Sequence, residues 1–268
     1  MSDDRADAEL AGELATQAGE LLLALREETG FDDPAALRKA GDAKSQELLG
    51  AALQRARAAD WVLSEEAADD LARLTGDRVW IVDPLDGTHE YGEEGRTDWA
   101  VHVALWQRGA GLVAGAVALP GLGRTLTTVG ELTGADGGMQ PLPQRGAPDG
   151  APRLAVSRTR RPVWFDEVAE RTGAVAVPIG SAGMKAMSVV LGDVDAYVHS
   201  GRMKEWDSAA PAAVAAAAGL HVSRLDGAPL EFNTPERLTL DLLICHPDLA
   251  EPLLDAVRHL AGQDATER

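Results

Sequence analysis

The most informative part of the sequence is Trp80-Ile81-Val82-Asp83-Pro84-Leu85-Asp86-Gly87-Thr88. Its first three residues are apolar and two of them are β-branched, which predicts a buried strand. We expect this strand to end at Asp83, because proline follows and the Asp-Gly pair favours a turn. Two carboxylates and a hydroxyl would then lie at a strand end, and Mg²⁺ prefers oxygen ligands of this kind. The simpler alternative is a strand followed by an ordinary Asp-Gly turn.

Acidic residues also follow the preceding predicted strand, at 61–63, where the sequence continues Ser64-Glu65-Glu66. If both strands lie parallel in one sheet, Glu65 and Asp83 converge on the carboxyl edge, where α/β proteins bind ligands. The alternative for these acids is the solvated start of a helix. Asp42 would lie in the first turn of a helix at 42–59, where a negative charge is favoured, and an ordinary helix cap is its simplest explanation.

The order of the predicted elements indicates an α/β fold. A helix at 5–28 precedes the part just described, and strands at 99–107, 112–119 and 124–129 form an antiparallel meander. Strands and helices then alternate: strands at 154–156, 175–178, 194–199 and 240–245, and helices at 163–171, 181–191, 207–218 and 248–261. We divide the chain into an N-terminal lobe (1–130), a loose connection rich in Gly and Pro (131–152) and a C-terminal lobe (153–268).

The composition excludes several classes of function. The chain has 268 residues and a formal charge of −18, which argues against nucleic acid or an anionic membrane as partner. Bound cations would reconcile this charge with an anionic substrate. Cys245 is the only cysteine, so no intramolecular disulfide is possible. The acidic N-terminus lacks a signal-peptide layout and no apolar run reaches membrane-spanning length, so we expect a cytoplasmic protein.

A second motif is Glu205-Trp206-Asp207-Ser208-Ala209-Ala210-Pro211. Taken alone, Asp207 would be read as a helix N-cap. Together with Asp83-Pro84-Leu85-Asp86-Gly87-Thr88, however, the motif resembles the two signatures of the inositol monophosphatase superfamily of metal-dependent phosphatases. This resemblance spans roughly residues 37–225 and implies a layered αβαβα sandwich. Phosphatases that form a phospho-aspartate intermediate also end a strand with two aspartates, but these lie two residues apart. Here the position two before Asp86 is Pro84, which cannot be a nucleophile, so this mechanism does not fit.

The resemblance also implies roles for individual residues. Asp42 and Thr88 would orient the attacking water, although Lys39 stands where the family usually has the threonine that precedes this aspartate. Gly87 and Thr88 would contact the substrate phosphate. Two or three Mg²⁺ ions would neutralise the phosphate and activate the water. Their ligands would be the side chains of Glu65, Asp83, Asp86 and Asp207 and the carbonyl of Leu85.

The substrate is expected to be a small phosphorylated metabolite. Gly180, Ser181 and Lys185 open a predicted helix, whose N-terminus beside a lysine suits an anion. This part, with Ser157, is similar to the CysQ-type branch of the superfamily, and most of all to its actinobacterial members. That branch cleaves 3′-phosphoadenosine 5′-phosphate, and Asp207 would also contact the substrate.

Several alternatives stay open at this point. The same site could act on inositol 1-phosphate or fructose 1,6-bisphosphate. The chain could also be a catalytically silent sensor that binds metal and nucleotide. His89 directly follows the first motif and could touch the substrate, and a homodimer is possible. Ser181 and Lys185 also have simpler explanations, as a helix cap and an exposed lysine.

Overall fold

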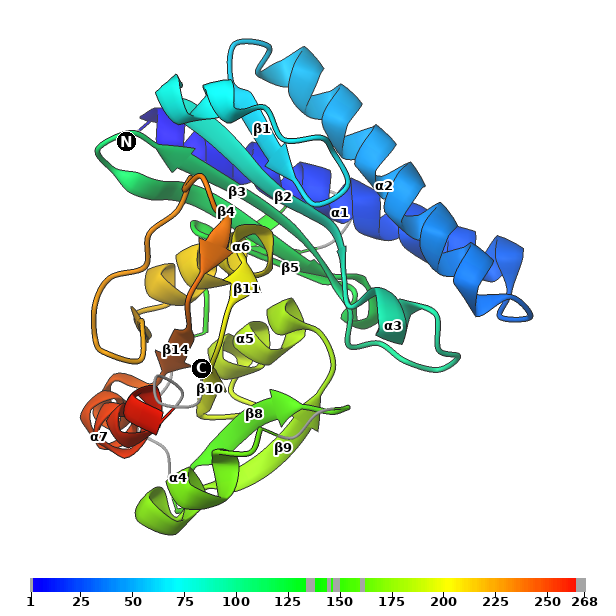
Figure 1. Ribbon diagram of the computed structural model, residues 1–268. Coiled ribbons are helices and arrows are strands. Elements are labelled where there is room, and N and C mark those ends of the chain that lie inside the picture. The colour runs from blue at the N-terminus through cyan, green and yellow to red at the C-terminus, as the bar shows by residue number, and fades with distance from the viewer. Residues whose placement is uncertain (1, 134–137, 144–145, 147–149, 160–161, 264–268) are drawn as a thin grey trace.

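The computed structural model describes residues 2–133, 138–143, 146, 150–159 and 162–263. These residues form five layers, helix–sheet–helix–sheet–helix, as the resemblance implied (Figure 1). Two helices cover the outer face of the first sheet, two lie between the sheets, and two cover the second sheet (Figure 1). In that order, the helices are α1 (Ser2–Thr29), α2 (Pro34–Ala56), α5 (Ala182–Leu191), α6 (Glu205–Ala217), α4 (Phe165–Thr172) and α7 (Pro247–Gln263).

The first sheet has the strand order β1-β2-β3-β4-β5-β6-β7. Its strands are β1 (Trp61–Ser64), β2 (Arg78–Asp86), β3 (Ala100–Gln107), β4 (Gly111–Leu119), β5 (Arg124–Thr127), β6 (Gly130–Thr133) and β7 (Gly138–Gln140). β1 and β2 are parallel, which is the condition under which we expected Glu65 and Asp83 to converge, and the other neighbouring pairs are antiparallel. Short helices join them: η1 (Leu71–Thr75), α3 (Thr88–Tyr91) and η2 (Pro120–Leu122).

Strand β2, which carries the first motif, is longer than the sequence suggested. β2 does not end at Asp83 but continues to Asp86, and its register against β3 shifts between these two residues. The irregularity explains how Pro84, which has no N–H to donate, is accommodated within a strand. It also separates the two aspartates by a local bend instead of a turn. The turn comes one residue later, at Gly87, where φ is +85°.

The stretch at 131–152, which we expected to be a loose connection, contains most of strand β6 and all of strand β7. β6 pairs with β5, and β7 pairs with β6. Thr127 Oγ1 donates to the Gly130 carbonyl at 2.8 Å and supports the tight turn into β6. Pairing with a sheet edge thus overrides the low strand propensity of this Gly-rich sequence. Residues 134–137, 144–145 and 147–149 lie outside the described part, and the division into lobes stays a prediction.

The second sheet has the order β12-β14-β10-β8-β9. β8 pairs in parallel with β9 and β10, as expected for alternating strands and helices, whereas β14 is antiparallel to both of its neighbours. A small ribbon of β11 and β13 lies beside α6. The strands are β8 (Arg153–Ser157), β9 (Val175–Ile179), β10 (Ala196–His199), β11 (Met203–Lys204), β12 (His221–Ser223), β13 (Leu238–Thr239) and β14 (Leu242–Cys245).

The start of α2 corrects our interpretation of Asp42. The N-cap is Asp33, whose carboxylate accepts the N–H groups of Ala35 and Ala36, and Pro34 occupies the first turn. Asp42 therefore lies in the middle of the helix and neither caps it nor belongs to its first turn. The explanation of Asp42 as a cap is wrong. α6 likewise begins before Asp207, which occupies its first turn instead of the N-cap position.

The layers enclose separate apolar cores. Because β2 is buried on both faces, Trp80 packs toward α1 and α2, and Ile81 packs toward α5 and α6. In the second sheet, Ile244 faces the middle layer and Leu243 faces α4 and α7. Among the described residues, no helix is long and apolar enough to cross a membrane.

Candidate active site

Three carboxylates from distant parts of the chain meet between the two sheets. Asp83 and Asp86 come from β2, and Asp207 comes from the first turn of α6. Each offers an oxygen, and these three oxygens lie within 4.8 Å of one another. Asp83 accepts the Leu85 N–H at 3.0 Å, and Asp207 accepts the Lys204 N–H at 3.3 Å. The backbone therefore fixes both carboxylates in place.

Asp86 is held by the start of α5. Its two carboxylate oxygens accept the N–H groups of Ala182 at 3.2 Å and Gly183 at 2.5 Å. His102 Nε2 lies 3.3 Å from the same carboxylate, and its Nδ1 lies 3.0 Å from the Trp206 carbonyl. A Cβ atom at Gly183 would come within 2.1 Å of His102, so this close approach requires glycine.

The electrostatics of the three aspartates differ. Burial opposes ionisation of Asp86, but His102 and the Gly183 N–H outweigh it and lower the pKa of Asp86. Burial, followed by repulsion from Asp86, raises the pKa of Asp83 well above its usual range. The same two causes raise the pKa of Asp207 to about 6. Crowded, buried carboxylates of this kind fit a divalent cation, which would relieve their repulsion.

Asp42 and Thr88 face each other beside this cluster. Thr88 Oγ1 lies 3.4 Å from Asp42 Oδ1 and 3.0 Å from the Leu85 carbonyl. Burial and then repulsion from Glu66 raise the pKa of Asp42 to about 6. The contact shows that a mid-helix position of Asp42 brings it to Thr88. Lys39 is exposed on the same helix.

Glu65 does not belong to the group of three carboxylates within 4.8 Å. It is exposed, and it follows β1 with its N–H donating to the Val82 carbonyl at 3.3 Å. Although the residue as a whole is exposed, its carboxyl group is partly desolvated. This desolvation, followed by repulsion from Asp207, raises the pKa of Glu65 to about 7. Glu65 is thus within electrostatic reach of the cluster from the carboxyl end of the strand beside β2, as the parallel pairing predicted.

A cavity of about 950 Å³ opens beside these residues, and we call it the carboxylate cavity. Gly87 and His89 from the first half of the chain line it, together with Asp207 and other residues of the second half. Four residues that we expected to contact the substrate also line it: Ser157, Gly180, Ser181 and Lys185.

The N-terminus of α5 is less open than we expected. Ala182 and Gly183 donate their N–H groups to Asp86, and Met184 donates to the Ser181 side chain at 3.1 Å. The Lys185 ammonium is 7% exposed and donates to the carbonyls of Gly180 and Ser181. The first donors of this helix are therefore already bound within the protein. Ser181 caps the helix, and Lys185 is buried instead of exposed.

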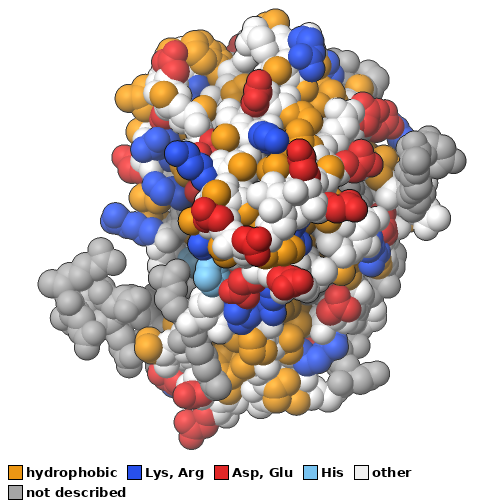
Figure 2. Space-filling model, turned by 90° about the vertical axis from the view of Figure 1, so that its right-hand side faces the viewer, with side chains coloured by type: hydrophobic (Ala, Val, Ile, Leu, Met, Phe, Trp, Pro, Cys, Tyr) orange, Lys and Arg blue, Asp and Glu red, His pale blue; other side chains and the backbone are white. Residues whose placement is uncertain are grey.

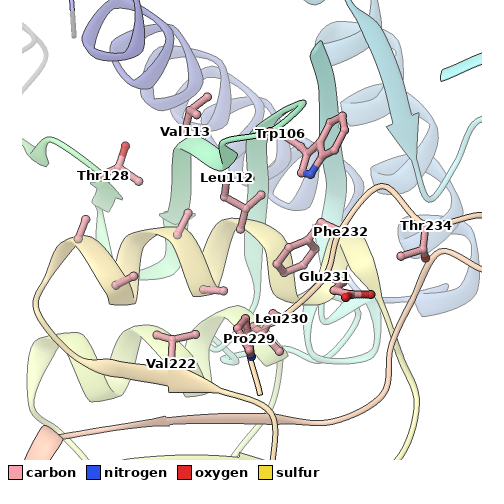
Figure 3. Close-up of a pocket in the computed structure, with 16 residues that line it drawn as sticks. Trp106, Leu112, Val113, Thr128, Val222, Pro229, Leu230, Glu231, Phe232 and Thr234 are labelled. Atoms are coloured by element: carbon pink, nitrogen blue, oxygen red, sulfur yellow. The ribbon is translucent and has the colours of Figure 1, made fainter. Parts of the chain in front are cut away.

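A second cavity, of about 1050 Å³, has a different character, and we call it the apolar cavity (Figure 3). Figure 3 shows Trp106, Leu112 and Phe232 gathered beside α6. The alanine face of that helix forms one wall, and Glu231 is the acidic side chain labelled there. This lining offers little that could bind a phosphate or a cation.

Comparisons with known proteins agree with this geometry. The family model "Inositol monophosphatase family" matches residues 4–259. The chain belongs to the inositol monophosphatase family. This family is metal-dependent, in keeping with the acidic cluster.

Curated relatives place the chain more narrowly within the family. It is 50% identical over 267 residues to the 3′-phosphoadenosine 5′-phosphate phosphatase of Mycobacterium leprae, covering 95% of this chain and 94% of the relative. The fold is similar to that of CysQ from Bacteroides thetaiotaomicron, with a TM-score of 0.75, 26% identity, and 90% and 97% of the two chains covered. A structure of SaIMPase-II with bound 2′-AMP has a TM-score of 0.76 at 20% identity over 96% and 97% of the chains, which supports the fold.

His102 is the site residue that our sequence analysis missed. It lies in β3, opposite Asp83 in the register of the sheet. The available signal was a polar residue inside the apolar run of Ala100–Gln107, on a strand expected to pair with β2. Its contacts with Asp86 and with α6 depend on how the middle layer packs, which a single sequence does not reveal.

Proposed function

We propose that the protein hydrolyses the 3′-phosphate of 3′-phosphoadenosine 5′-phosphate, releasing AMP and phosphate. 3′-Phosphoadenylyl sulfate, which carries the same 3′-phosphate, is a second candidate substrate. The observation that carries the proposal is the meeting of three carboxylates, whose oxygens lie within 4.8 Å of one another, close to the Asp42–Thr88 pair. One of the three, Asp207, lines the carboxylate cavity. The identity of 50% to a relative named for this reaction supports the choice of substrate.

In the proposal, two or three Mg²⁺ ions occupy the acidic cluster. When bound, they would neutralise the phosphate and lower the pKa of the attacking water. Their ligands would be Glu65, Asp83, Asp86 and Asp207, with the Leu85 carbonyl. The Leu85 carbonyl oxygen accepts a hydrogen bond from the Thr88 hydroxyl, and its second lone pair would remain for a metal ion.

The remaining work falls to the chain's own groups. Asp42 and Thr88 are close enough to share a water between them, with Asp42 as the acceptor of its proton. Gly87 adopts a left-handed conformation, and a Cβ there would lie 2.7 Å from Ser181. Its backbone can therefore approach the phosphate closely, which a larger residue would prevent. The leaving oxygen of the nucleoside would point into the carboxylate cavity.

The charges on the molecular surface also bear on the class of substrate. Figure 2 shows acidic side chains spread over one face of the molecule, with basic ones between them. Such a surface suits a small metabolite better than a nucleic acid or an anionic membrane. A cytoplasmic location and a homodimer stay predictions.

Phosphate release by the purified protein with Mg²⁺ tests the proposal. The substrates to compare are 3′-phosphoadenosine 5′-phosphate, inositol 1-phosphate and fructose 1,6-bisphosphate. We expect the highest kcat/KM for the nucleotide. A preference for either of the other two esters would keep the chemistry of the site and overturn the substrate. No release from any of them, with Mg²⁺ still bound, would favour a silent sensor.

A further inference from the structure

We propose that Arg202 binds the second phosphate of the substrate, the one that is not hydrolysed. This inference rests on the proposed function, because a bisphosphate nucleotide presents a second anionic group away from the reacting one. It assigns a specificity-determining role to a residue outside the acidic cluster. The geometry of the carboxylate cavity and the distribution of its charges carry the argument.

Arg202 lines the carboxylate cavity from a loop whose two ends are fixed. On one side, Trp164 Nε1 donates to Ser200 Oγ at 2.5 Å. On the other, Met203 pairs with Thr239 in the ribbon of β11 and β13. Gly201 turns the chain between them with φ of +91°. The loop then runs directly into α6 and Asp207, so its position is tied to that of the reacting end.

Among the described residues that line this cavity, the other basic side chains are engaged or neutral. The Lys185 ammonium donates to two carbonyls. His89 Nε2 lies 2.9 Å from a carboxylate oxygen of Glu93. Burial, followed by the charge of Lys185, lowers the pKa of His199 to about 4, so this ring is uncharged near neutral pH. None of these three side chains is an exposed cation without a partner.

Arg202 differs from them because it is exposed and, among the described residues, has no ion-pair partner. Neighbouring arginines show the contrast: Arg158 pairs with Glu90 and Glu93, and Arg224 pairs with Asp226 and Asp241. In a chain with a net charge of −18, an uncompensated guanidinium at the wall of the reaction cavity is unusual.

The chemistry of this wall fits a phosphorylated nucleoside. A guanidinium can donate two parallel hydrogen bonds to a phosphate, which gives both strength and direction. Pro162 and Val163 line the same cavity, and Val163 is 99% exposed. They offer an apolar surface in the cavity that Arg202 also lines, on which a base can lie. The acidic cluster would take the 3′-phosphate with its cations, and Arg202 would take the 5′-phosphate.

The test compares two substrates with three variants. The substrates are 3′-phosphoadenosine 5′-phosphate and adenosine 3′-phosphate, which lacks the second phosphate. For Arg202→Ala, we expect KM for the bisphosphate to rise about 10- to 100-fold, the range for one lost charge-assisted contact, with kcat nearly unchanged. KM for adenosine 3′-phosphate should not change. Arg202→Lys keeps the charge but not the two parallel donors, so its KM for the bisphosphate should lie between those of the wild-type protein and Arg202→Ala.

Arg55→Ala is the matched control. Arg55 is also exposed, lies in the last turn of α2, and does not line the cavity, so its removal changes the net charge equally. It should leave both KM values unchanged. If Arg202→Ala raises KM for both substrates alike, or for neither, the inference is overturned while the proposed function stands. If the wild-type protein releases no phosphate from the bisphosphate, the proposed function fails and this inference fails with it.

Discussion

The carboxylate cavity and the apolar cavity have similar volumes, about 950 and 1050 Å³, yet they differ in almost every other respect. α6 contributes to both. Its first turn presents Asp207 to the carboxylate cavity, whereas its alanine face forms a wall of the apolar cavity. The end of a helix carries a partial charge and unpaired backbone groups, but its side offers only side chains.

This contrast shows that volume alone does not identify a reaction site. The carboxylate cavity lies beside the starts of α5 and α6, where Ser181 and Asp207 line it, and Asp207 joins it to the acidic cluster at the bend of β2. The apolar cavity lies where side chains from the β3–β4 hairpin and the segment 229–234 pack incompletely on α6. The following predictions test whether chemistry belongs to the first cavity alone.

The largest effect is expected for Asp207→Asn. It removes one of the three clustered carboxylates and should lower kcat/KM on the order of 1000-fold, as for the loss of a key electrostatic contact at a reaction centre. Glu231→Gln makes the same chemical change in the apolar cavity and should leave kcat/KM unchanged. Steady-state phosphate release measures both. Equal losses in the two variants would remove the functional distinction between the cavities.

Asp42→Asn should lower kcat about 100-fold, the lower end of what general bases contribute. Because Asp42 is not one of the proposed metal ligands, the rise in melting temperature on adding Mg²⁺ should persist. Lys39→Ala, on the exposed surface of the same helix, serves as the control and should keep full activity. A loss of Mg²⁺-dependent stabilisation in Asp42→Asn would instead place Asp42 among the ligands.

The metal-free protein should become less stable as the pH rises. The pKa values of Asp42, Glu65 and Asp207, at about 6, 7 and 6, are raised above the usual value near 4. A raised carboxyl pKa favours the folded state below the ordinary pKa, and this contribution disappears as the pH passes the folded value.

Melting curves in a chelator should therefore shift to lower temperature between pH 5 and pH 8. In a chain of this size, each kcal/mol corresponds to about 2–4 °C. Excess Mg²⁺ should remove most of the shift, and Asp207→Asn should reduce it. A melting temperature that rises over this pH range would show that the carboxylates are not crowded in solution.

The smallest effect on activity is expected in the apolar cavity. Phe232→Ala removes a partly buried ring and should lower the free energy of unfolding by about 1–2 kcal/mol, less than for a fully buried phenylalanine. Activity at a temperature well below unfolding should not change. Denaturant titration measures the first quantity, and phosphate release measures the second. A change in KM without a change in stability would connect this cavity to the substrate.

Some parts of the fold follow from local sequence. The apolar run before Asp83 predicted strand β2, and the alternation of strands and helices in the second half predicted its βα units. The acids after β1 indicated a shared edge with Asp83 on the condition that the two strands are parallel. The start of α2 was available in the sequence as Asp33-Pro34, an N-cap followed by proline at the first turn. We placed the helix start near Asp42 instead, which gave the wrong position within the helix although the residue does reach Thr88.

Other parts depend on contacts between distant segments. β6 and β7 form because β5 presents an unpaired edge, and their Gly-rich sequence does not favour a strand. Likewise, Lys185 is buried with its ammonium donating to the carbonyls of Gly180 and Ser181, whereas we expected it either to bind the substrate or to be exposed. His102 contacts Asp86 only because Gly183 allows α5 to approach β3.

The joining of Asp86 and Asp207 at one point has a mechanical consequence. These residues are roughly 120 positions apart in the chain, and a cation held between them would act as a reversible cross-link. Because the two carboxylates come together only in the folded chain, such an ion would stabilise the fold through its binding free energy, whereas a disulfide also restricts the unfolded chain. Cys245 is the single cysteine, so the chain cannot make a disulfide of its own. Its two halves would instead be fastened when the ion arrives and released when it leaves.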